Sequence, residues 1–315
     1  MYRIGVDLGG TNISVGVVDG DFNIIGRGKM KTNTPRPAEE IFADIAKAVE
    51  MAIDDAGINM DEVISIGVGT PGTVNNETGT IEYANNLGFD NVPAKKILED
   101  LTGKPCFFAN DASCAALGEF YAGAGKGSKN LVAVTLGTGV GSGIVIEGKL
   151  FRGANSAGGE LGHTVINVNG EPCNCGRNGC WERYASATAL IAQTKAAMEQ
   201  NPDSKMWNCA GGKLENVNGR TSFDAMRMGD EAAKELVDKY TYYVAVGVIN
   251  IINIFQPDVV CIGGGICNEG ETLLAPVREF CYQERYSKYS KNQAKICKAE
   301  LGNDAGVIGA ALLNA

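Results

Sequence analysis

The chain of 315 residues has no long hydrophobic run and no excess of basic residues. Nowhere do eighteen apolar residues follow one another, so we expect no membrane-spanning helix. The first apolar stretch, residues 4–18, has no basic flank and no small-residue cleavage site, which argues against a signal peptide. A net charge of −9 argues against a nucleic acid or an anionic membrane as partner. We therefore expect a cytoplasmic protein that binds neither.

Histidine is nearly absent, whereas cysteine is abundant. Most of the ten cysteines stand singly among apolar residues, as buried thiols do in a reducing compartment. Only Cys173, Cys175 and Cys180 form a cluster, and they follow His163, the single histidine. Three thiolates and one imidazole make the tetrahedral set of a structural zinc site, although buried thiols or a disulfide within the trio are the alternative. We expect Zn²⁺ that orders a loop and does not activate water.

An internal repeat organises the chain. Residues 3–18 read as an apolar run, a Gly-Gly-Thr turn and a second apolar run, and residues 131–146 repeat this pattern around Leu-Gly-Thr-Gly. Each segment predicts a β-hairpin with a glycine-rich turn. Apolar strands that run into glycine loops follow at residues 63–72 and 259–266. The sequence thus predicts two copies of one βα unit.

Helices are predicted between these strands. Residues 38–56 place apolar side chains at helical spacing on one face, and Gly57 provides a C-terminal stop. Strand–helix alternation favours an α/β fold with two similar lobes that meet near Asp111, and ligands are expected between them at the carboxyl ends of the strands. Further helices are predicted at residues 112–122, 184–198, 230–255, 271–286 and 305–313.

The turns of both hairpins are candidates for phosphate binding. Their glycines let backbone N–H groups approach an anion, and Thr11 adds a hydroxyl donor. Asp7 ends a buried strand and can hold Mg²⁺, although a plain turn with a solvated Asp is the alternative. Two such turns can hold adjacent phosphates of one nucleotide, with the glycine run 263–265 near its base or ribose. The predicted nucleotide-binding residues are Asp7, Gly9, Gly10, Thr11, Asn12, Gly137, Thr138, Gly139, Gly264 and Gly265.

Two common nucleotide motifs do not fit. Residues 67–72 match G-x-G-x-x-G after a strand, but Pro71 and the turn-rich residues 74–76 stand where a dinucleotide-binding helix should begin. Around Lys126 and Lys129 no G-x-x-x-x-G-K-[ST] sequence can be aligned. We therefore exclude a dinucleotide fold and a P-loop.

Several carboxylates are candidates for acid–base chemistry and sugar binding. Asn110 and Asp111 stand between an apolar strand and a helix, where a carboxylate can accept a proton from a bound hydroxyl. Spacing alone favours a simpler role for Asp111 as the helix cap. Glu160 and Glu182 flank the cysteine cluster and can accept hydrogen bonds from neighbouring hydroxyls of a polyol. The ring nitrogen of His163 that does not face the metal can donate to a hydroxyl.

Together these motifs resemble the ROK family (repressors, uncharacterised reading frames and sugar kinases), and within it the bacterial glucokinases. The resemblance covers essentially the whole chain. It implies a two-lobed actin/hexokinase-like (ribonuclease H-like) α/β fold whose C-terminal helix returns to the N-terminal lobe. The small lobe is then residues 1–111 with about 302–315, and the large lobe is residues 112–301. The motifs are residues 7–12, 69–72, 110–111, 136–143, 160–163, the three cysteines with Glu182, and 263–265.

The resemblance also implies a function, the phosphorylation of a hexose at its 6-hydroxyl by ATP with Mg²⁺. Glucose is the expected substrate. The resemblance also implies that Asp111 is the base, whereas spacing alone favours it as the helix cap. A kinase for fructose, N-acetylmannosamine or N-acetylglucosamine is an alternative, as is a sugar-sensing regulator without catalysis. Polyphosphate as donor stays open, as does the choice between homodimer and homotetramer. The implied sugar-binding residues are Gly72, Asn86, Asn110, Asp111, Glu160, His163 and Glu182.

Overall fold

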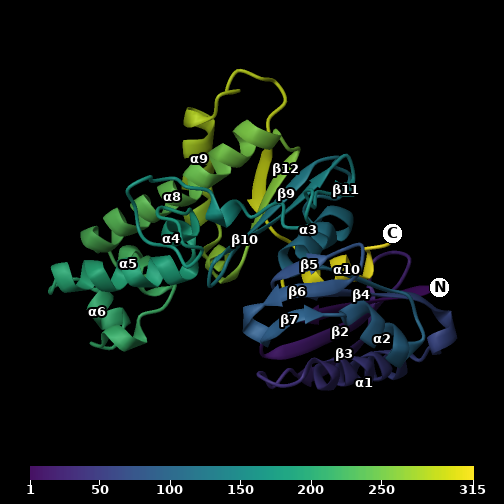
Figure 1. The fold of residues 1–315 in the computed structure, drawn as a ribbon. Helices are drawn as coiled ribbons and strands as arrows, with labels where there is room; N and C mark the ends of the chain where they lie inside the picture. Colours follow the sequence, from purple (N-terminus) through teal and green to yellow (C-terminus); the bar gives the residue numbers. More distant parts are fainter. The chain divides into compact units, whose positions relative to one another are not determined.

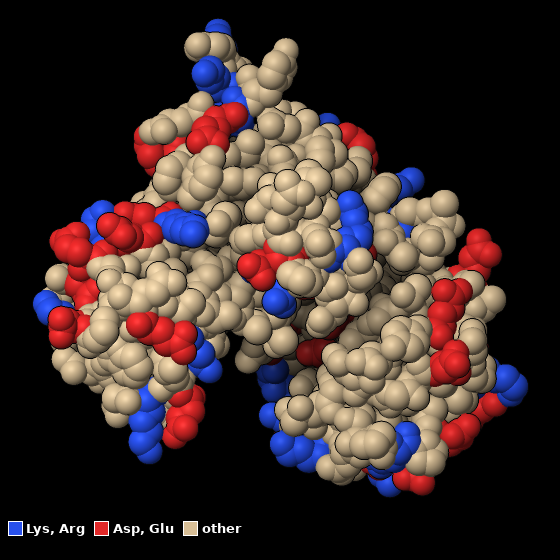
Figure 2. Space-filling model, turned by 60° about the vertical axis from the view of Figure 1, so that its left-hand side comes forward, with Lys and Arg blue, Asp and Glu red and all other residues tan.

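A computed structural model describes residues 1–315, which form two compact units. Unit 1 comprises residues 1–133, 143–159 and 299–315, and unit 2 comprises residues 134–142 and 160–298. The lobe boundaries expected from the sequence stay a prediction. None of the helices combines the length and the apolar character that a membrane span requires. On the face drawn in Figure 2, acidic and basic side chains are interspersed.

The first sheet has the strand order β3-β2-β1-β4-β8, and Figure 1 labels its strands β2, β3 and β4. β1 pairs antiparallel with β2 and parallel with β4, which in turn pairs parallel with β8. The hairpin predicted at residues 3–18 is confirmed as β1 and β2. Because β1, β4 and β8 are parallel, their carboxyl ends lie along one edge of the sheet. The strands are β1 (Tyr2–Leu8), β2 (Asn12–Val18), β3 (Ile24–Lys31), β4 (Val63–Thr70) and β8 (Cys106–Asn110).

The second sheet has the order β11-β10-β9-β12-β13, which repeats the plan of the first. An antiparallel pair, β10 and β11, stands at one side, and a parallel pair, β12 and β13, at the other. The predicted duplication is therefore confirmed. The strands are β9 (Leu131–Leu136), β10 (Val140–Ile146), β11 (Lys149–Leu150), β12 (Val259–Gly263) and β13 (Lys295–Lys298).

A three-stranded antiparallel sheet, β5-β6-β7, follows β4. The sequence did not predict it, because its strands are short and contain many polar residues. Since β4 leads into a strand and not into a helix, the exclusion of a dinucleotide fold is confirmed. The strands are β5 (Thr73–Asn75), β6 (Thr80–Ala84) and β7 (Phe89–Val92).

The helices of unit 1 cover its five-stranded sheet. α1 has the predicted bounds and ends at Gly57, whose φ of 65° is the left-handed conformation that glycine adopts readily. The last helix, α10, packs against α3, β1 and β4. Gly67 permits this close contact, because a methyl group there would lie 1.7 Å from the carbonyl oxygen of Ala310. These helices are α1 (Ala38–Ala56), α2 (Ala94–Thr102), α3 (Asp111–Ala122) and α10 (Asp304–Ala311).

Unit 2 contains most of the remaining helices. The single helix predicted at residues 184–198 is wrong, because Ser186 has an extended backbone and separates two helices. The Ser186 hydroxyl accepts a hydrogen bond from the Ala189 amide at 3.0 Å and so caps the second helix. The helices are α4 (Glu182–Ala185), α5 (Ala187–Gln200), α6 (Met206–Cys209), α7 (Thr221–Arg227), α8 (Glu231–Phe255) and α9 (Glu271–Glu284), with 3₁₀ turns elsewhere at Met60–Glu62, Asn85–Leu87, Leu161–His163, Leu214–Asn216 and Gly265–Glu269.

Candidate active site and metal centre

Two carboxylates, Asp7 and Asp111, lie at the carboxyl edge of the first sheet. Asp7 of β1 stands beside Gly69 of β4, and Thr70 of β4 stands beside Asn110, which Asp111 follows directly. Gly69 lies against the start of α3, since a Cβ atom there would be 3.1 Å from Cys114 Sγ and 3.6 Å from the Asp111 Cα. The structure therefore brings together the residue predicted to hold Mg²⁺ and the residue predicted to act as base.

The environment of these carboxylates disfavours their charged forms. Burial raises the pKa of Asp7 to about 6, and the negative charge of Asp111 contributes in the same direction. Asp111 is exposed, but the protein atoms around it displace enough water to raise the pKa of its carboxyl. Hydrogen bonds from the Ala112 amide act in the opposite direction. Two acidic groups that resist ionising together suit a site that receives a cation or a proton.

Asn110, and not Asp111, is the N-cap of α3. Its Oδ1 accepts hydrogen bonds from the amides of Ala112 at 2.9 Å and Ser113 at 3.3 Å. Its Nδ2 donates to the carbonyl oxygen of Gly72 at 3.4 Å. Spacing alone favours Asp111 as the helix cap. This prediction is wrong, because Asn110 is the cap. Asp111 is the first residue of the helix, and its carboxylate at 2.8 Å from the Ala112 amide lies at the positive end of the helix dipole.

The first glycine-rich turn is held by side chains that follow β3. Inside the turn, the Gly9 amide donates to the Asn12 carbonyl oxygen at 2.9 Å. The hydroxyls of Thr32 and Thr34 donate to the carbonyl oxygens of Gly9 at 2.6 Å and Gly10 at 3.0 Å. These two threonines were not predicted as part of the site, although they stand two residues apart in the segment directly after a strand. They occupy carbonyl groups of the turn, so the amides of Gly10 and Thr11, and not that of Gly9, are the groups left to face an anion.

Two other residues that the sequence predicts for the site, Asn12 and Asn86, lie at this turn. Lys31 of β3 donates from its Nζ to Asn12 Oδ1 at 3.0 Å. Asn86 lies against Gly10, since a Cβ atom on Gly10 would be 3.6 Å from the Asn86 carbonyl oxygen. Asn12 and Asn86 therefore belong to the surroundings of the same turn in unit 1.

The second glycine-rich turn, residues 137–139, is anchored within unit 2. Its Gly137 amide donates to the Gly139 carbonyl oxygen at 3.0 Å, and the Ala187 amide donates to the Gly137 carbonyl oxygen at 2.8 Å. Gly264 has a φ of 96°, and a Cβ atom there would meet the Leu136 carbonyl oxygen at 2.3 Å. The structure thus places Gly264 next to the turn, with Gly265 following it, as expected for parts of one nucleotide site.

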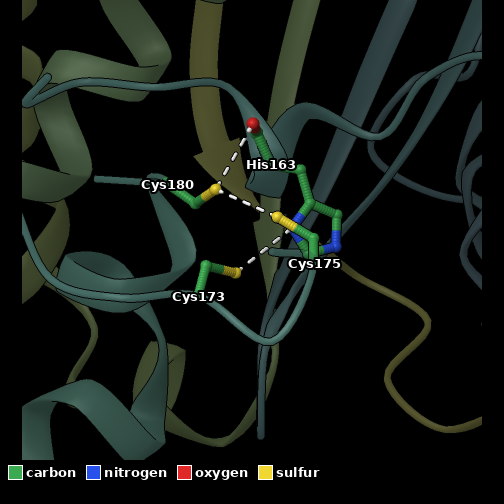
Figure 3. Close-up of side chains that lie close together, drawn as sticks. All are labelled: His163, Cys173, Cys175 and Cys180. Atoms are coloured by element: carbon green, nitrogen blue, oxygen red, sulfur yellow. Dashed lines mark hydrogen bonds between the residues drawn. The ribbon is translucent and has the colours of Figure 1, made fainter. Parts of the chain in front are cut away.

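The three clustered cysteines and the histidine lie within reach of one ion (Figure 3). Cys173 Sγ is 3.6 Å from His163 Nδ1, and Cys175 Sγ is 3.5 Å from Cys180 Sγ. All four ligand atoms lie within 4.8 Å of one another, and the cysteines are free thiols. Sulfur atoms around a tetrahedral zinc with bonds of about 2.3 Å lie roughly 3.8 Å apart. The cluster therefore has the donor set and the dimensions of a metal site.

Glu182 connects this cluster to the second glycine-rich turn. Its Oε1 lies 3.3 Å from Cys173 Sγ and 3.8 Å from His163 Nδ1, and its Oε2 accepts from the Val140 amide at 3.4 Å. Since Nδ1 of His163 faces the cluster, Nε2 is the ring nitrogen left for a ligand. The Glu160 carbonyl oxygen accepts from the His163 amide at 3.1 Å, so both residues belong to one short turn. Glu160, His163 and Glu182 are thus brought together in unit 2, and their contact with sugar stays a prediction.

The chain is similar to known proteins over its full length. Residues 3–315 match the model of the ROK family. A glucokinase of Halalkalibacterium halodurans is 37% identical over 98% of this chain and 93% of its own length. A glucokinase of Thermotoga maritima is also 37% identical, over 98% of this chain and 95% of its own length. The crystal structure of a ROK family glucokinase from Streptomyces griseus in complex with glucose and AMPPNP superposes with a TM-score of 0.82 and 34% identity, covering 99% of both chains. This chain belongs to the ROK family.

Proposed function

We propose that this protein is a glucokinase, which transfers the γ-phosphoryl group of ATP to the 6-hydroxyl of glucose. The similarity to proteins named glucokinase supports this activity, because it extends over nearly all of both chains. The observation in the structure that carries the proposal is Asp111, an exposed carboxylate at the N-terminus of α3 beside Asp7. Asp111 Oδ1 accepts from the Ala112 amide, and Oδ2 is the oxygen available to a hydroxyl group of a substrate.

In the proposed reaction, Asp111 accepts the proton of the 6-hydroxyl while that oxygen attacks the γ-phosphorus of ATP. The bond to the bridging oxygen breaks, and ADP leaves with its electron pair. Asp7 is the residue that would hold Mg²⁺, which neutralises charge on the phosphate oxygens. The backbone amides of residues 10–11 and 137–139 stabilise the phosphates, with the run 263–265 near the base or ribose.

Recognition of the sugar is proposed to involve the residues that the sequence predicts for it. Asn110 and Asp111 would face the 6-hydroxyl, and Gly72 and Asn86 are further contacts. Glu160, Glu182 and the Nε2 atom of His163 are proposed for the other hydroxyls, the latter two toward the anomeric end. An analogue that lacks one of these hydroxyls leaves a buried polar group of the site unpaired, which costs about 1–3 kcal/mol of binding free energy. Such a site is therefore selective among hexoses.

We also propose that the cysteine cluster holds a structural Zn²⁺. The donor set of three thiolates and one imidazole supports zinc over harder cations. Four protein ligands leave no position for a reactive water, so the metal orders the segment between Glu160 and Glu182. Free thiols throughout the chain support a reducing, cytoplasmic setting. A homodimer or homotetramer is the assembly we propose.

A coupled assay of ATP consumption across a panel of hexoses tests the proposal. We expect glucose to exceed galactose and 2-deoxyglucose by roughly tenfold or more in kcat/KM. N-acetylmannosamine should be poorer still, because its acyl group needs additional space. If N-acetylmannosamine or fructose gives the highest kcat/KM, the enzyme is a kinase for that sugar and not a glucokinase. If no hexose is phosphorylated, the kinase proposal itself fails.

A further inference from the structure

Unit 2 contains a cleft that none of the proposed ATP, sugar or zinc ligands lines. It has a volume of about 340 Å³ and lies among α4, α5 and α8. Known pockets for small molecules have volumes of roughly 300–1,000 Å³, so the cleft has room for one metabolite. Its floor includes alanines of α5, and its functional groups come from Glu171, Arg183, Tyr184, Gln193, Lys239 and Tyr243.

Two of the three charged side chains in the cleft are cations without an ionic partner. Arg183 and Lys239 form no ion pair, in a chain whose net charge is −9. The Nε atom of Arg183 is buried and has no hydrogen-bond partner. Lys239 Nζ lies 5.9 Å from the centroid of the Tyr243 ring. The terminal nitrogens of the Arg183 guanidinium form no hydrogen bond and are not buried, so an anionic group in the cleft can accept from them.

A hydrogen-bond acceptor on α5, the side-chain oxygen of Gln193, has no donor. Gln193 donates from Nε2 to the Tyr184 carbonyl oxygen at 3.0 Å, which fixes the orientation of its amide. Its Oε1 is buried and accepts no hydrogen bond. Glu171, the third charged residue of the cleft, is exposed and is a further acceptor. Since Gln193 Oε1 is closed to solvent, the exposed Glu171 carboxylate is the acceptor that hydroxyl groups of a ligand would reach.

An aromatic wall completes the cleft. The rings of Tyr184 and Tyr243 lie 4.9 Å apart at an angle of 48°. The Tyr184 hydroxyl is occupied, because it accepts from the Glu171 amide at 2.8 Å. Such a wall presents ring faces and edges on which the C–H face of a sugar ring can pack. An anion, several hydroxyls and an apolar ring face are found together in one class of metabolite.

We propose that this cleft binds a phosphorylated sugar. Its phosphate would contact Arg183 and Lys239, and its hydroxyls would contact Glu171. Helix α4 connects the cleft to the metal centre, because Glu182 faces the cysteine cluster while Arg183, the next residue, lines the cleft. Trp181, directly before α4, donates from Nε1 to the Tyr243 carbonyl oxygen at 2.8 Å. A ligand in the cleft therefore acts on the helix that carries Glu182. The binding proposal does not depend on the proposed kinase activity.

Calorimetric titration of the full chain tests the proposal, with saturating glucose and AMPPNP present to block the proposed active site. The probes are glucose 6-phosphate, ribose 5-phosphate and inorganic phosphate. We expect one of the sugar phosphates to bind once per chain with a Kd below about 1 mM, and inorganic phosphate to bind at least about tenfold more weakly. If neither sugar phosphate gives measurable binding up to about 10 mM, the proposal is overturned.

Variants assign the binding to the cleft. Lys239→Gln and Arg183→Gln should each weaken binding about tenfold, since each removes a charged partner of the phosphate. Lys234→Gln is the matched control, because Lys234 lies on the same helix but is exposed and paired with Asp238. It should bind like the unchanged protein. Equal binding by the Lys239 and Lys234 variants would overturn the assignment, and Lys239, being exposed, keeps this test valid if the Arg183 variant does not fold. Absence of glucose phosphorylation would contradict the kinase proposal alone.

Discussion

The two five-stranded sheets have the same strand order, but only the first carries acidic residues at its functional edge. Asp7 precedes Leu8 and Gly9 at the end of β1, whereas Thr135 precedes the matching Leu-Gly pair at the end of β9. β8 leads into Asn110 and Asp111, whereas β13 ends at Lys298. Duplication thus supplied two glycine-rich turns, and the proposed acid–base chemistry belongs to one copy only.

The two turns are also supported in different ways. Hydroxyls of Thr32 and Thr34, which follow β3, hold the first turn. The second turn is held from an inserted segment, through the Ala187 amide and the Glu182 carboxylate. Because the same segment contains the cysteine cluster, the proposed metal would support the second turn and not the first. Variants of each half should separate these contributions.

Asp111→Asn should give the largest effect. The substitution keeps the size of the side chain but removes the proposed base, and loss of such a base costs ~10²–10⁴ in rate. We expect kcat to fall by this amount while glucose binding, measured calorimetrically, stays within about tenfold. Asp100→Asn, an exposed carboxylate of the same unit paired with Lys96, is the control and should keep full activity. Near-normal turnover of the Asp111 variant would remove Asp111 from the mechanism.

Loss of the proposed metal should have the second largest effect, which acts on glucose binding through Glu182. Cys175→Ser should lose the ion and raise the KM for glucose by roughly tenfold or more, because Glu182 loses its support. Elemental analysis of the unchanged protein should find one zinc per chain, and X-ray absorption should find Zn–S distances of ~2.3 Å. Cys209→Ser changes a cysteine outside the cluster and should keep both zinc and KM. Full activity without metal would show that the cluster has no role in sugar binding.

Local patterns explain what could be predicted from the sequence. The hairpins follow from alternation of apolar runs with Gly-Thr turns, and α1 follows from helical spacing that ends at Gly57. The metal centre could be predicted because all four ligands lie close together in the sequence, between His163 and Cys180. Each of these features lies within fewer than about twenty consecutive residues. Over this length, periodicity and spacing are informative.

The remaining features depend on contacts between distant segments. The support of Gly9 by Thr32 joins two loop residues that follow different strands, β1 and β3, and are 23 positions apart, so no local pattern predicts the contact. The assignment of the cap to Asn110 depends on backbone angles at the end of β8, which spacing alone does not fix. The break at Ser186 was missed because apolar spacing continues across it, while a single extended residue with a capping hydroxyl ends one helix and begins the next.

Gly67→Ala tests the close packing of α10 on the first sheet. A methyl group 1.7 Å from the Ala310 carbonyl oxygen forces the helix to move. We expect the free energy of unfolding to fall by about 1–3 kcal/mol, as for other overpacked sites. Gly20→Ala is the control, since no atom lies within 4 Å of a Cβ atom there, and it should be nearly neutral. Urea unfolding measures both, and equal midpoints would show that α10 is not held this closely.

The stability effect at Asp7 should be the smallest and most specific of those predicted here, a dependence of the free energy of unfolding on pH. Its pKa rises from 3.8 to about 6 on folding, so the folded protein binds the proton more tightly than the unfolded chain. This contribution to stability is fully present below about pH 3.8 and is lost as the pH rises through about 6. Asp7→Asn removes the charge, so at pH 7.5 the variant should be more stable than the unchanged protein by about 1–2 kcal/mol.

The same variant should be inactive or nearly so, because the proposed Mg²⁺ ligand is lost, and gain of stability with loss of activity is the signature of a functional carboxylate. At pH 4 its advantage in stability should have largely disappeared, since Asp7 is then mostly protonated in the folded state. Thr135→Val is the matched control at the equivalent position of the second sheet, and its stability difference should not vary with pH. Urea unfolding at pH 4 and pH 7.5 measures both variants. An Asp7 variant that is less stable at pH 7.5 would mean that this carboxylate holds the first sheet together, and the contrast between the two sheets would then be structural and not catalytic.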